Sequence, residues 1–206
     1  MLSERFQSTV TRLELHNTSC ELDADWTQPC TLTFLESLTI TEEFPPKYYT
    51  ITLNENFLQD MSRLTELEFR RITMRGMIDV SHLKLTRLAL LSERTGGFVF
   101  SSALQAANQL PQLKHFSMCA TSLAGYPLQF MIGLTQLEYL DLRGFSYTPD
   151  KWRLLLANLQ PSLRVLRVLE CQANEQLREV VNQFPEGNKI HLIVEPLHEG
   201  IAYSYQ

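Results

Sequence analysis

The sequence predicts an α/β repeat fold in which parallel strands lie side by side in one open sheet, joined by helical or irregular returns. Three observations support this prediction. A short apolar motif recurs along the chain, apolar and polar residues alternate within each copy, and several connecting segments have helical periodicity. Such units bury a continuous core only by stacking, which is typical of solenoid proteins. We expect residues 1–206 to form a single domain.

The recurring motif has the form LxxLxL, in which each L is an apolar residue. Its clearest copy is Leu137-Glu-Tyr-Leu140-Asp-Leu142. The central apolar residues of seven copies are separated by 25, 29, 21, 28, 24 and 26 residues, and a degenerate eighth copy follows. The predicted repeat strands are 10–15, 35–40, 64–69, 85–90, 113–118, 137–142 and 163–168, with a terminal strand at 189–194.

Alternation within the motif separates the two faces of the predicted sheet. Side chains of a strand point alternately to opposite sides, so Leu140 and Leu142 face the core while Tyr139, Asp141 and Arg143 face outward. The first apolar residue of each copy lies at the turn that enters the strand, where it fills the corner of the coil. Polar outward positions therefore predict that one face of the sheet is exposed to solvent.

Helical periodicity marks several of the returns. Apolar residues at i, i+3, i+4 and i+7 form two stripes. The stripes are Trp152, Leu155, Leu156 and Leu159, and Leu177, Val180, Val181 and Phe184. Thr148 is a candidate N-cap with Pro149 at the first helical position, and Pro185 and Gly187 are stop signals after the second stripe. Weaker patterns predict helices over residues 101–110 and about 54–61.

A doubly wound sheet also alternates strands and helices, and two features argue against it. Strands buried on both faces are continuous apolar runs. The outward positions here include Glu14, Thr39, Glu68, Asp141 and Arg167. The Gly96-Gly97 pair also lacks the lysine and further glycines of a phosphate-binding loop. We therefore favour the solenoid.

Composition limits the classes of partner. The chain has 18 Lys and Arg against 23 Asp and Glu, a formal net charge of -5, without long runs of one sign. Nucleic acids and anionic membranes are bound by clustered positive charge, so we expect neither as a partner. There is no apolar run of signal-peptide or membrane-spanning length, which predicts a cytoplasmic or nuclear protein.

The cysteines and histidines do not predict a metal or cofactor. Cys20, Cys30, Cys119 and Cys171 lack CxxC spacing, so we expect reduced thiols, with a Cys20–Cys30 bridge as the alternative. The five histidines lie in different repeats and none has a second ligand at metal-binding spacing. No metal and no cofactor are therefore expected.

Over about residues 10–194 these motifs resemble the leucine-rich repeat family. The resemblance implies a curved horseshoe with a concave parallel β-sheet and a helical or irregular convex side. The helical returns resemble the ribonuclease-inhibitor-like and cysteine-containing subclasses, the latter common in F-box substrate receptors. The family places Asn or Cys after the motif, with two residues between it and the last leucine. Here that position holds Thr18, Glu43, Ile72, Glu93, Thr121, Phe145 and Cys171, of which Cys171 alone matches.

The first predicted strand is an open edge, and about nine residues precede it. Unpaired strand edges invite association. Either residues 1–9 cover this edge or a segment upstream of Met1 does, and an uncovered edge would allow self-association. The oligomeric state is therefore left open, as is the presence of an F-box outside this chain.

The concave face is the predicted binding surface. Tyr and Arg dominate the energetics of protein interfaces, and both gather on the outward positions of the C-terminal strands. The candidate partner-binding residues are Arg87, His115, Tyr139, Asp141, Arg143 and Arg167. The alternative is that cross-strand pairs such as Asp141 and Arg167 only satisfy each other.

These residues predict binding and not catalysis. His115 and Cys119 share a strand face, but they lack the third group that would orient a thiol–imidazole pair. We expect a protein-interaction module, with the resemblance favouring the substrate-recognition part of an F-box ubiquitin-ligase receptor. The alternative is a sensor or inhibitor-type leucine-rich repeat scaffold.

Overall fold

The computed structural model describes the repeat strands, the turns that enter them and two helices. The described residues are 10–17, 32–42, 51–52, 58–70, 74–75, 80, 82–91, 110–119, 131, 133–145, 147–159, 161–169, 174–183 and 190–195.

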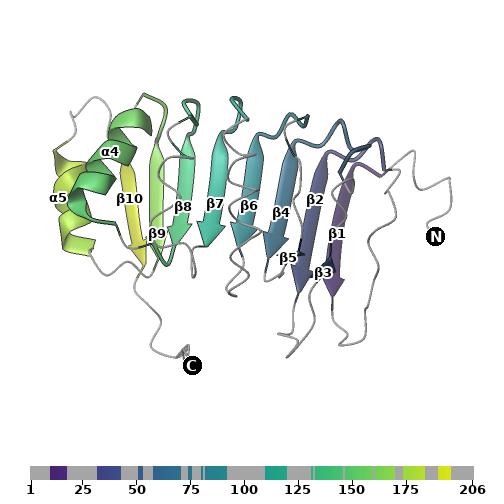
Figure 1. Ribbon diagram of the computed structural model, residues 1–206, viewed down its shortest axis with the longest axis horizontal. Helices are drawn as coiled ribbons and strands as arrows, with labels where there is room; N and C mark the ends of the chain where they lie inside the picture. Colours follow the sequence, from purple (N-terminus) through teal and green to yellow (C-terminus); the bar gives the residue numbers. More distant parts are fainter. Residues whose placement is uncertain are drawn as a thin grey trace.

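Eight parallel strands form one open sheet whose order follows the chain (Figure 1). They are β1 (Arg12–Asn17), β2 (Ser37–Glu42), β4 (Glu66–Arg70), β6 (Arg87–Leu91), β7 (His115–Cys119), β8 (Tyr139–Arg143), β9 (Val165–Leu169) and β10 (His191–Glu195). A separate parallel pair consists of β3 (Ile51–Thr52) and β5 (Met74–Arg75). The architecture is therefore α/β and solenoid-like, with neighbours in sequence also neighbours in the sheet.

Each of the eight strands begins two residues after its predicted start. The reason is that the first apolar residue of the motif lies in the preceding turn, as the sequence suggested. In β2, for example, the Leu35 N–H donates to the Leu32 carbonyl at 3.1 Å, and the strand begins only at Ser37. Leu137 makes the same bond to Leu134 at 3.1 Å, and both Leu35 and Leu137 are fully buried.

The residue before each strand joins one repeat to the next. The Thr11 carbonyl accepts two hydrogen bonds from the following repeat, from Glu36 N–H at 2.8 Å and from Ser37 N–H at 3.0 Å. The carbonyls of Glu36, Thr65, Thr86, Lys114 and Glu138 accept the corresponding pairs from the repeats that follow them. The side chains at this position differ widely, so the recurring part of the joint is made by backbone atoms. At two joints a hydroxyl adds to it, because Thr65 Oγ1 donates to the Glu36 carbonyl at 3.2 Å and Thr86 Oγ1 to the Thr65 carbonyl at 3.3 Å.

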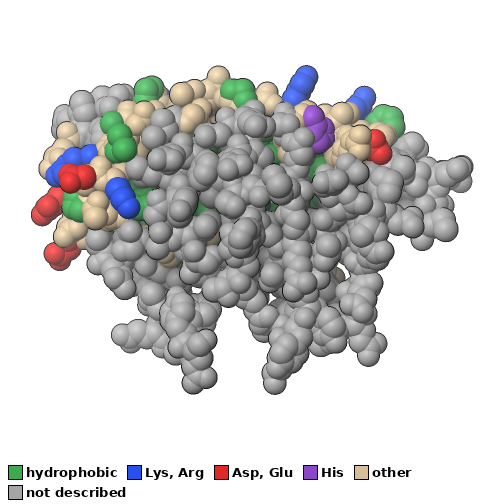
Figure 2. All heavy atoms as spheres, viewed as in Figure 1, with side chains coloured by type: hydrophobic (Ala, Val, Ile, Leu, Met, Phe, Trp, Pro, Cys, Tyr) green, Lys and Arg blue, Asp and Glu red, His purple; other side chains and the backbone are tan. Residues whose placement is uncertain are grey.

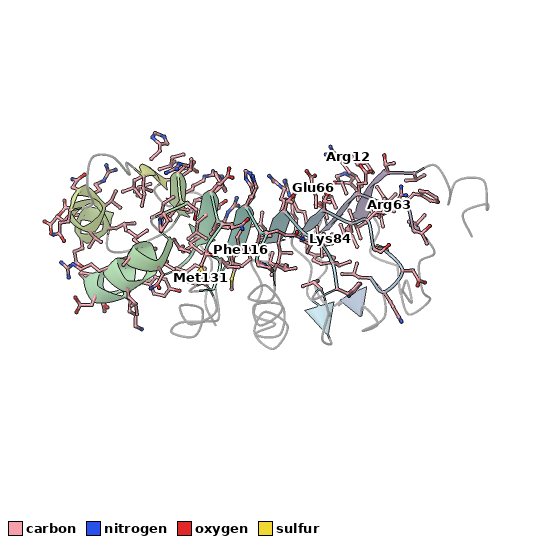
Figure 3. All side chains as sticks on the ribbon, turned by 90° about the horizontal axis from the view of Figure 1, so that it is seen from above. Arg12, Arg63, Glu66, Lys84, Phe116 and Met131 are labelled. Atoms are coloured by element: carbon pink, nitrogen blue, oxygen red, sulfur yellow. The ribbon has the colours of Figure 1, made fainter. Side chains whose placement is uncertain are left out.

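The core lies on one side of the sheet. In Figure 3 Phe116 and Met131 lie on that side, and Arg12 and Glu66 on the opposite one. The strand register aligns the inward residues in two rows. The rows are Leu13, Leu38, Leu67, Leu88, Phe116, Leu140, Leu166 and Leu192, and Leu15, Ile40, Phe69, Leu90, Met118, Leu142, Val168 and Val194. From β2 to β9 these residues are buried, whereas in the outer strands β1 and β10 they are partly exposed.

The first predicted stripe and the first three residues of the second lie in helices at the β10 end of the sheet (Figure 1). Helix α4 (Pro149–Leu159) buries all four residues of its stripe, and the Trp152 N–H donates to the Thr148 carbonyl at 3.0 Å, as expected for an N-cap. Helix α5 (Asn174–Asn182) packs against α4 and buries Leu177 and Val180. Phe184 and the stop signals lie outside the described residues. Neither helix is long and apolar enough to cross a membrane.

The helix predicted over about 54–61 is wrong where it is described, since residues 58–60 form a turn. Leu58, Met61 and Leu64 are all fully buried, and each later N–H donates to the earlier carbonyl at 3.0 Å. Successive tight turns place an apolar residue inward at every third position, which imitates part of a helical stripe. Of the helix predicted over 101–110, residues 101–109 lie outside the described part of the chain.

Candidate protein-binding face

The outward residues of the eight strands form three aligned rows, which we call the polar face. The register places each row straight across the sheet. The rows are Arg12, Ser37, Glu66, Arg87, His115, Tyr139, Val165 and His191; Glu14, Thr39, Glu68, Ala89, Ser117, Asp141, Arg167 and Ile193; and His16, Thr41, Arg70, Leu91, Cys119, Arg143, Leu169 and Glu195. The register therefore agrees with the alternation predicted for the seven repeat strands, β1, β2, β4 and β6 to β9.

The N-terminal cluster of this face consists of Glu68, Arg70 and Arg87. The Glu68 carboxylate is 11% exposed and accepts a hydrogen bond from Arg70 Nε, while Arg87 Nη2 lies 3.8 Å from its second oxygen. The two arginine side chains are 51% and 44% exposed. A buried carboxylate is thus covered by two accessible guanidinium groups.

Beside this cluster lies a small hollow of about 280 Å³. Its lining is Arg12, Ser37, Leu38, Thr39, Glu66, Leu67, Glu68, Arg70 and Arg87. Ser37 Oγ donates to Glu66 Oε2 at 3.1 Å, which occupies part of its polar surface. The hollow extends the N-terminal cluster toward β2.

The C-terminal cluster consists of Asp141, Arg143, Arg167 and Glu195. The Asp141 side chain is 2% exposed, and its Oδ2 accepts hydrogen bonds from Arg143 Nη2 at 3.0 Å and Nε at 3.3 Å. Arg167 Nη1 lies 3.6 Å from the same oxygen. Asp141 Oδ1 has no hydrogen-bond partner among the residues that the structure describes.

Arg167 is held from a second side by the last strand. Its Nε and Nη2 donate to the Glu195 carboxylate at 3.0 Å and 2.8 Å. These hydrogen bonds, with the nearby Asp141 charge, raise the pKa of the Arg167 guanidinium further above its ordinary value. The cluster therefore links β8, β9 and β10 through one charged network.

Between the two clusters lies a strip of uncharged residues on β6 and β7, which we call the central strip. It consists of Ala89, Leu91, Ser117 and Cys119. Ala89 and Cys119 are buried, at 1% and 5% exposed, although both point outward in the strand alternation. The His115 and Tyr139 rings, 5.8 Å apart, stack at the start of the strip. Small side chains thus lie between two arginine-bearing clusters.

The structure brings most of the predicted partner-binding residues together. Asp141, Arg143 and Arg167 form one network. Tyr139 adds the smallest of the contributions that raise the pKa of Arg167. Arg87 instead pairs with Glu68 in the other cluster, although His115 is its neighbour in the register. The cross-strand pair of Asp141 and Arg167, which was the alternative interpretation, is present at 3.6 Å. A partner-binding role for these residues stays a prediction.

The expectation that outward carboxylates are wet is wrong for Glu68 and Asp141. Alternation gives the side of the sheet but not the depth, and long arginine side chains from neighbouring positions cover these two acids. Sequence reasoning also missed Glu195, which lies one residue beyond the predicted terminal strand. Glu195 lies in the same row as Arg143 and Leu169, so extending the predicted alternation by one residue would have placed it on the outward face.

A second, more open hollow of about 600 Å³ lies at the edge where strands begin. Its lining is Lys114, Thr135, Gln136, Glu138, Pro161, Ser162 and Arg164. Lys114 Nζ lies 2.9 Å from Glu138 Oε1, and this contact lowers the pKa of the Glu138 carboxyl. This exposed ion pair is part of the lining of the hollow, which lies outside the polar face.

The polar face carries guanidinium, carboxylate, imidazole and hydroxyl groups. Among the described residues no group of three or more His, Cys, Asp and Glu side chains is arranged to hold a metal ion. Burial of Cys119 places its thiol at the floor of the central strip. In comparisons with known proteins, no family model and no curated protein matches this chain.

Proposed function

We propose that this chain is a protein-interaction module that binds its partner on the polar face, across β6 to β9. The observation that carries the proposal is the central strip, flanked by arginines that buried carboxylates hold in place. Side chains that are already ordered lose less entropy when a partner binds. Arg and Tyr are also the residues that contribute most at interfaces.

We further propose that the module is a leucine-rich repeat solenoid. In-register parallel strands support this, as do motif intervals of 21 to 29 residues and apolar corner residues at the strand entries. The polar face would then be the concave face of the horseshoe, on which such solenoids present extended binding surfaces. Phe145 occupies the family's Asn or Cys position and is buried at 2% exposed, so an apolar contact replaces the polar one there.

The more specific proposal is that the chain recruits substrates for an F-box ubiquitin ligase. Its support is the resemblance of the helical returns to the cysteine-containing subclass. A sensor or inhibitor-type scaffold is the second candidate. Substrate recruitment predicts that proteins captured by the polar face accumulate in cells when the chain is depleted, whereas a sensor or inhibitor scaffold predicts unchanged partner levels.

The experiment that tests binding on the polar face adds bulk at its centre. Ser117→Trp places an indole on the central strip, and Gln136→Trp places the same group on the exposed strand-entry edge. Each full-length variant captures proteins from lysate beside the unchanged chain, with quantitative mass spectrometry and a melting curve for each. Partners that are lost with Ser117→Trp and retained with Gln136→Trp support the proposal. Equal capture by both variants would exclude the polar face as the binding surface.

A further inference from the structure

The charges of the polar face are arranged at two depths. The carboxylates of Glu68 and Asp141 are 11% and 2% exposed, whereas Arg87, Arg143 and Arg167 are 44%, 30% and 27% exposed. Formal charges nearly balance across these residues. The charged groups that a partner can reach are nevertheless the guanidinium groups of the three arginines, because the two carboxylates lie beneath them.

The arginines keep hydrogen-bonding capacity after they have bound the buried acids. A guanidinium carries five N–H donors. The contacts of Arg143 with Asp141 use Nε and Nη2, and Arg87 approaches Glu68 through Nη2. In the contacts among the described residues, Nη1 of Arg87 and of Arg143 is not used. This nitrogen can therefore donate to a further acceptor. A carboxylate is the acceptor whose geometry and charge fit this fork best.

The spacing of the two clusters defines the shape of the ligand. Arg87 and Arg143 lie two strands apart and at opposite ends of their strands, so their backbones are separated by roughly 16 Å. The uncharged central strip lies between them. An extended chain covers this distance in about five residues, at roughly 3.3 Å each.

We propose that the polar face binds an acidic, extended segment of a partner protein, with two carboxylates about four to six residues apart and uncharged residues between them. The carboxylates bind Arg87 and Arg143, and small or apolar side chains lie on the central strip. The stacked rings of His115 and Tyr139 border the path at the strand entries. This inference rests on the proposed function and adds the chemical class of the partner.

The net charge of the chain does not oppose this partner at contact distance. The formal charge of -5 belongs to the whole chain. At physiological ionic strength the Debye length is about 8 Å, so distant carboxylates are screened while guanidinium groups in contact with the ligand are not. Recognition is therefore local, and added salt weakens it.

The test uses fluorescein-labelled 12-residue peptides and the full chain. The acidic probe carries two glutamates five residues apart, with serine, glycine and one leucine between them. Its comparators replace both glutamates with glutamine or with lysine, and a 12-nucleotide oligothymidine serves as a phosphate probe. Fluorescence anisotropy at 50 and 500 mM NaCl gives each Kd. We expect the glutamine peptide to bind at least about ten-fold more weakly than the acidic one, with weaker acidic binding at high salt.

Variants locate the binding on the polar face. Arg87→Gln removes one guanidinium and leaves Glu68 paired with Arg70. Arg143→Gln is combined with Asp141→Asn, so that no buried acid is left unpaired and the fold is kept. Arg153→Gln is the matched control, because Arg153 is 49% exposed and paired with Asp150 on α4. We expect about ten-fold weaker acidic-peptide binding for each polar-face variant and no change for the control.

Several outcomes would overturn the proposal. Equal affinity for the acidic and glutamine peptides would show that carboxylates are not recognised. Equal effects of Arg153→Gln and Arg87→Gln would show that the peptide does not bind specifically on the polar face. Oligothymidine binding as tight as that of the acidic peptide would show a phosphate site instead. Dimers that dissociate with Arg87→Gln would show a second copy as the occupant. If Ser117→Trp still abolishes partner capture in any of these cases, the proposed function stands without the acidic chemistry.

Discussion

Asp141 and Arg143 lie two residues apart on the same face of β8, and Arg143 Nε and Nη2 both donate to Asp141 Oδ2. The carboxylate is 2% exposed and the guanidinium 30%. The arginine therefore covers the acid and stabilises its charge in a site that water hardly reaches. We therefore expect truncation of the arginine to affect folding as well as the proposed binding, since a buried charge without its partner is costly.

The first prediction concerns this pair. Arg143→Ala should lower the free energy of unfolding by about 1–3 kcal/mol, because Arg167 alone remains near the buried carboxylate. The double variant with Asp141→Asn should recover much of this loss. Urea unfolding of the single and double variants measures both values. A loss that the double variant leaves unchanged would show that Arg143 stabilises the fold by packing and not by charge.

The second prediction concerns the inward rows. Leu140→Ala and Leu166→Ala should each cost about 2–5 kcal/mol, since both residues are fully buried in the central repeats. Leu154→Ala on α4 is the matched control, because Leu154 is 50% exposed and should change stability by less than about 0.5 kcal/mol. Melting and urea curves compare the three. Similar losses at Leu154 and Leu140 would contradict the assignment of the core.

The two rows could be predicted from sequence because a strand alternates with period two and the leucines recur at the same phase. The depth of a residue on the outward face could not. Glu68 and Thr39 occupy the same outward row, yet only Glu68 is buried, because Arg70 and Arg87 lie beside it. Arg70 is on the same strand as Glu68, but Arg87 comes from the next repeat. A pattern within one repeat does not show which side chains of the next repeat cover an acid.

The third prediction concerns alkaline pH. Tyr147 is 3% exposed, and burial raises the pKa of its phenol above the ordinary value near 10. The unfolded chain therefore releases this proton at lower pH than the folded chain. The resulting contribution to stability is present below pH 10 and is lost as the pH rises from about 10 toward the folded-state pKa.

Tyr147→Phe should remove this part of the alkaline destabilisation. Because the Tyr147 hydroxyl has no hydrogen-bond partner among the described residues, the variant should be neutral or slightly more stable at pH 7. Melting temperatures from pH 7 to 11 compare the two proteins. Parallel declines above pH 10 would contradict a buried, neutral phenol.

The fourth prediction concerns the last strand. Arg167 on β9 binds Glu195 on β10 through two nitrogens, and β10 pairs with β9 within the described sheet. Glu195→Gln should raise amide exchange in β10 roughly three- to ten-fold, because it weakens the charged contact between the strands. Hydrogen exchange read by mass spectrometry measures this, with β2 as the internal reference. Faster exchange in β2 as well would indicate global destabilisation instead.

The backbone joint between repeats has a consequence for how such a chain can change in evolution. One carbonyl and two N–H groups make the joint at Thr11, Glu36, Thr65, Thr86, Lys114 and Glu138. Duplication or loss of a whole unit would create a new boundary between the same atoms. The array could therefore lengthen or shorten in steps of one repeat while the surface of each unit diverges. The length of the polar face and the side chains that it carries would then change independently.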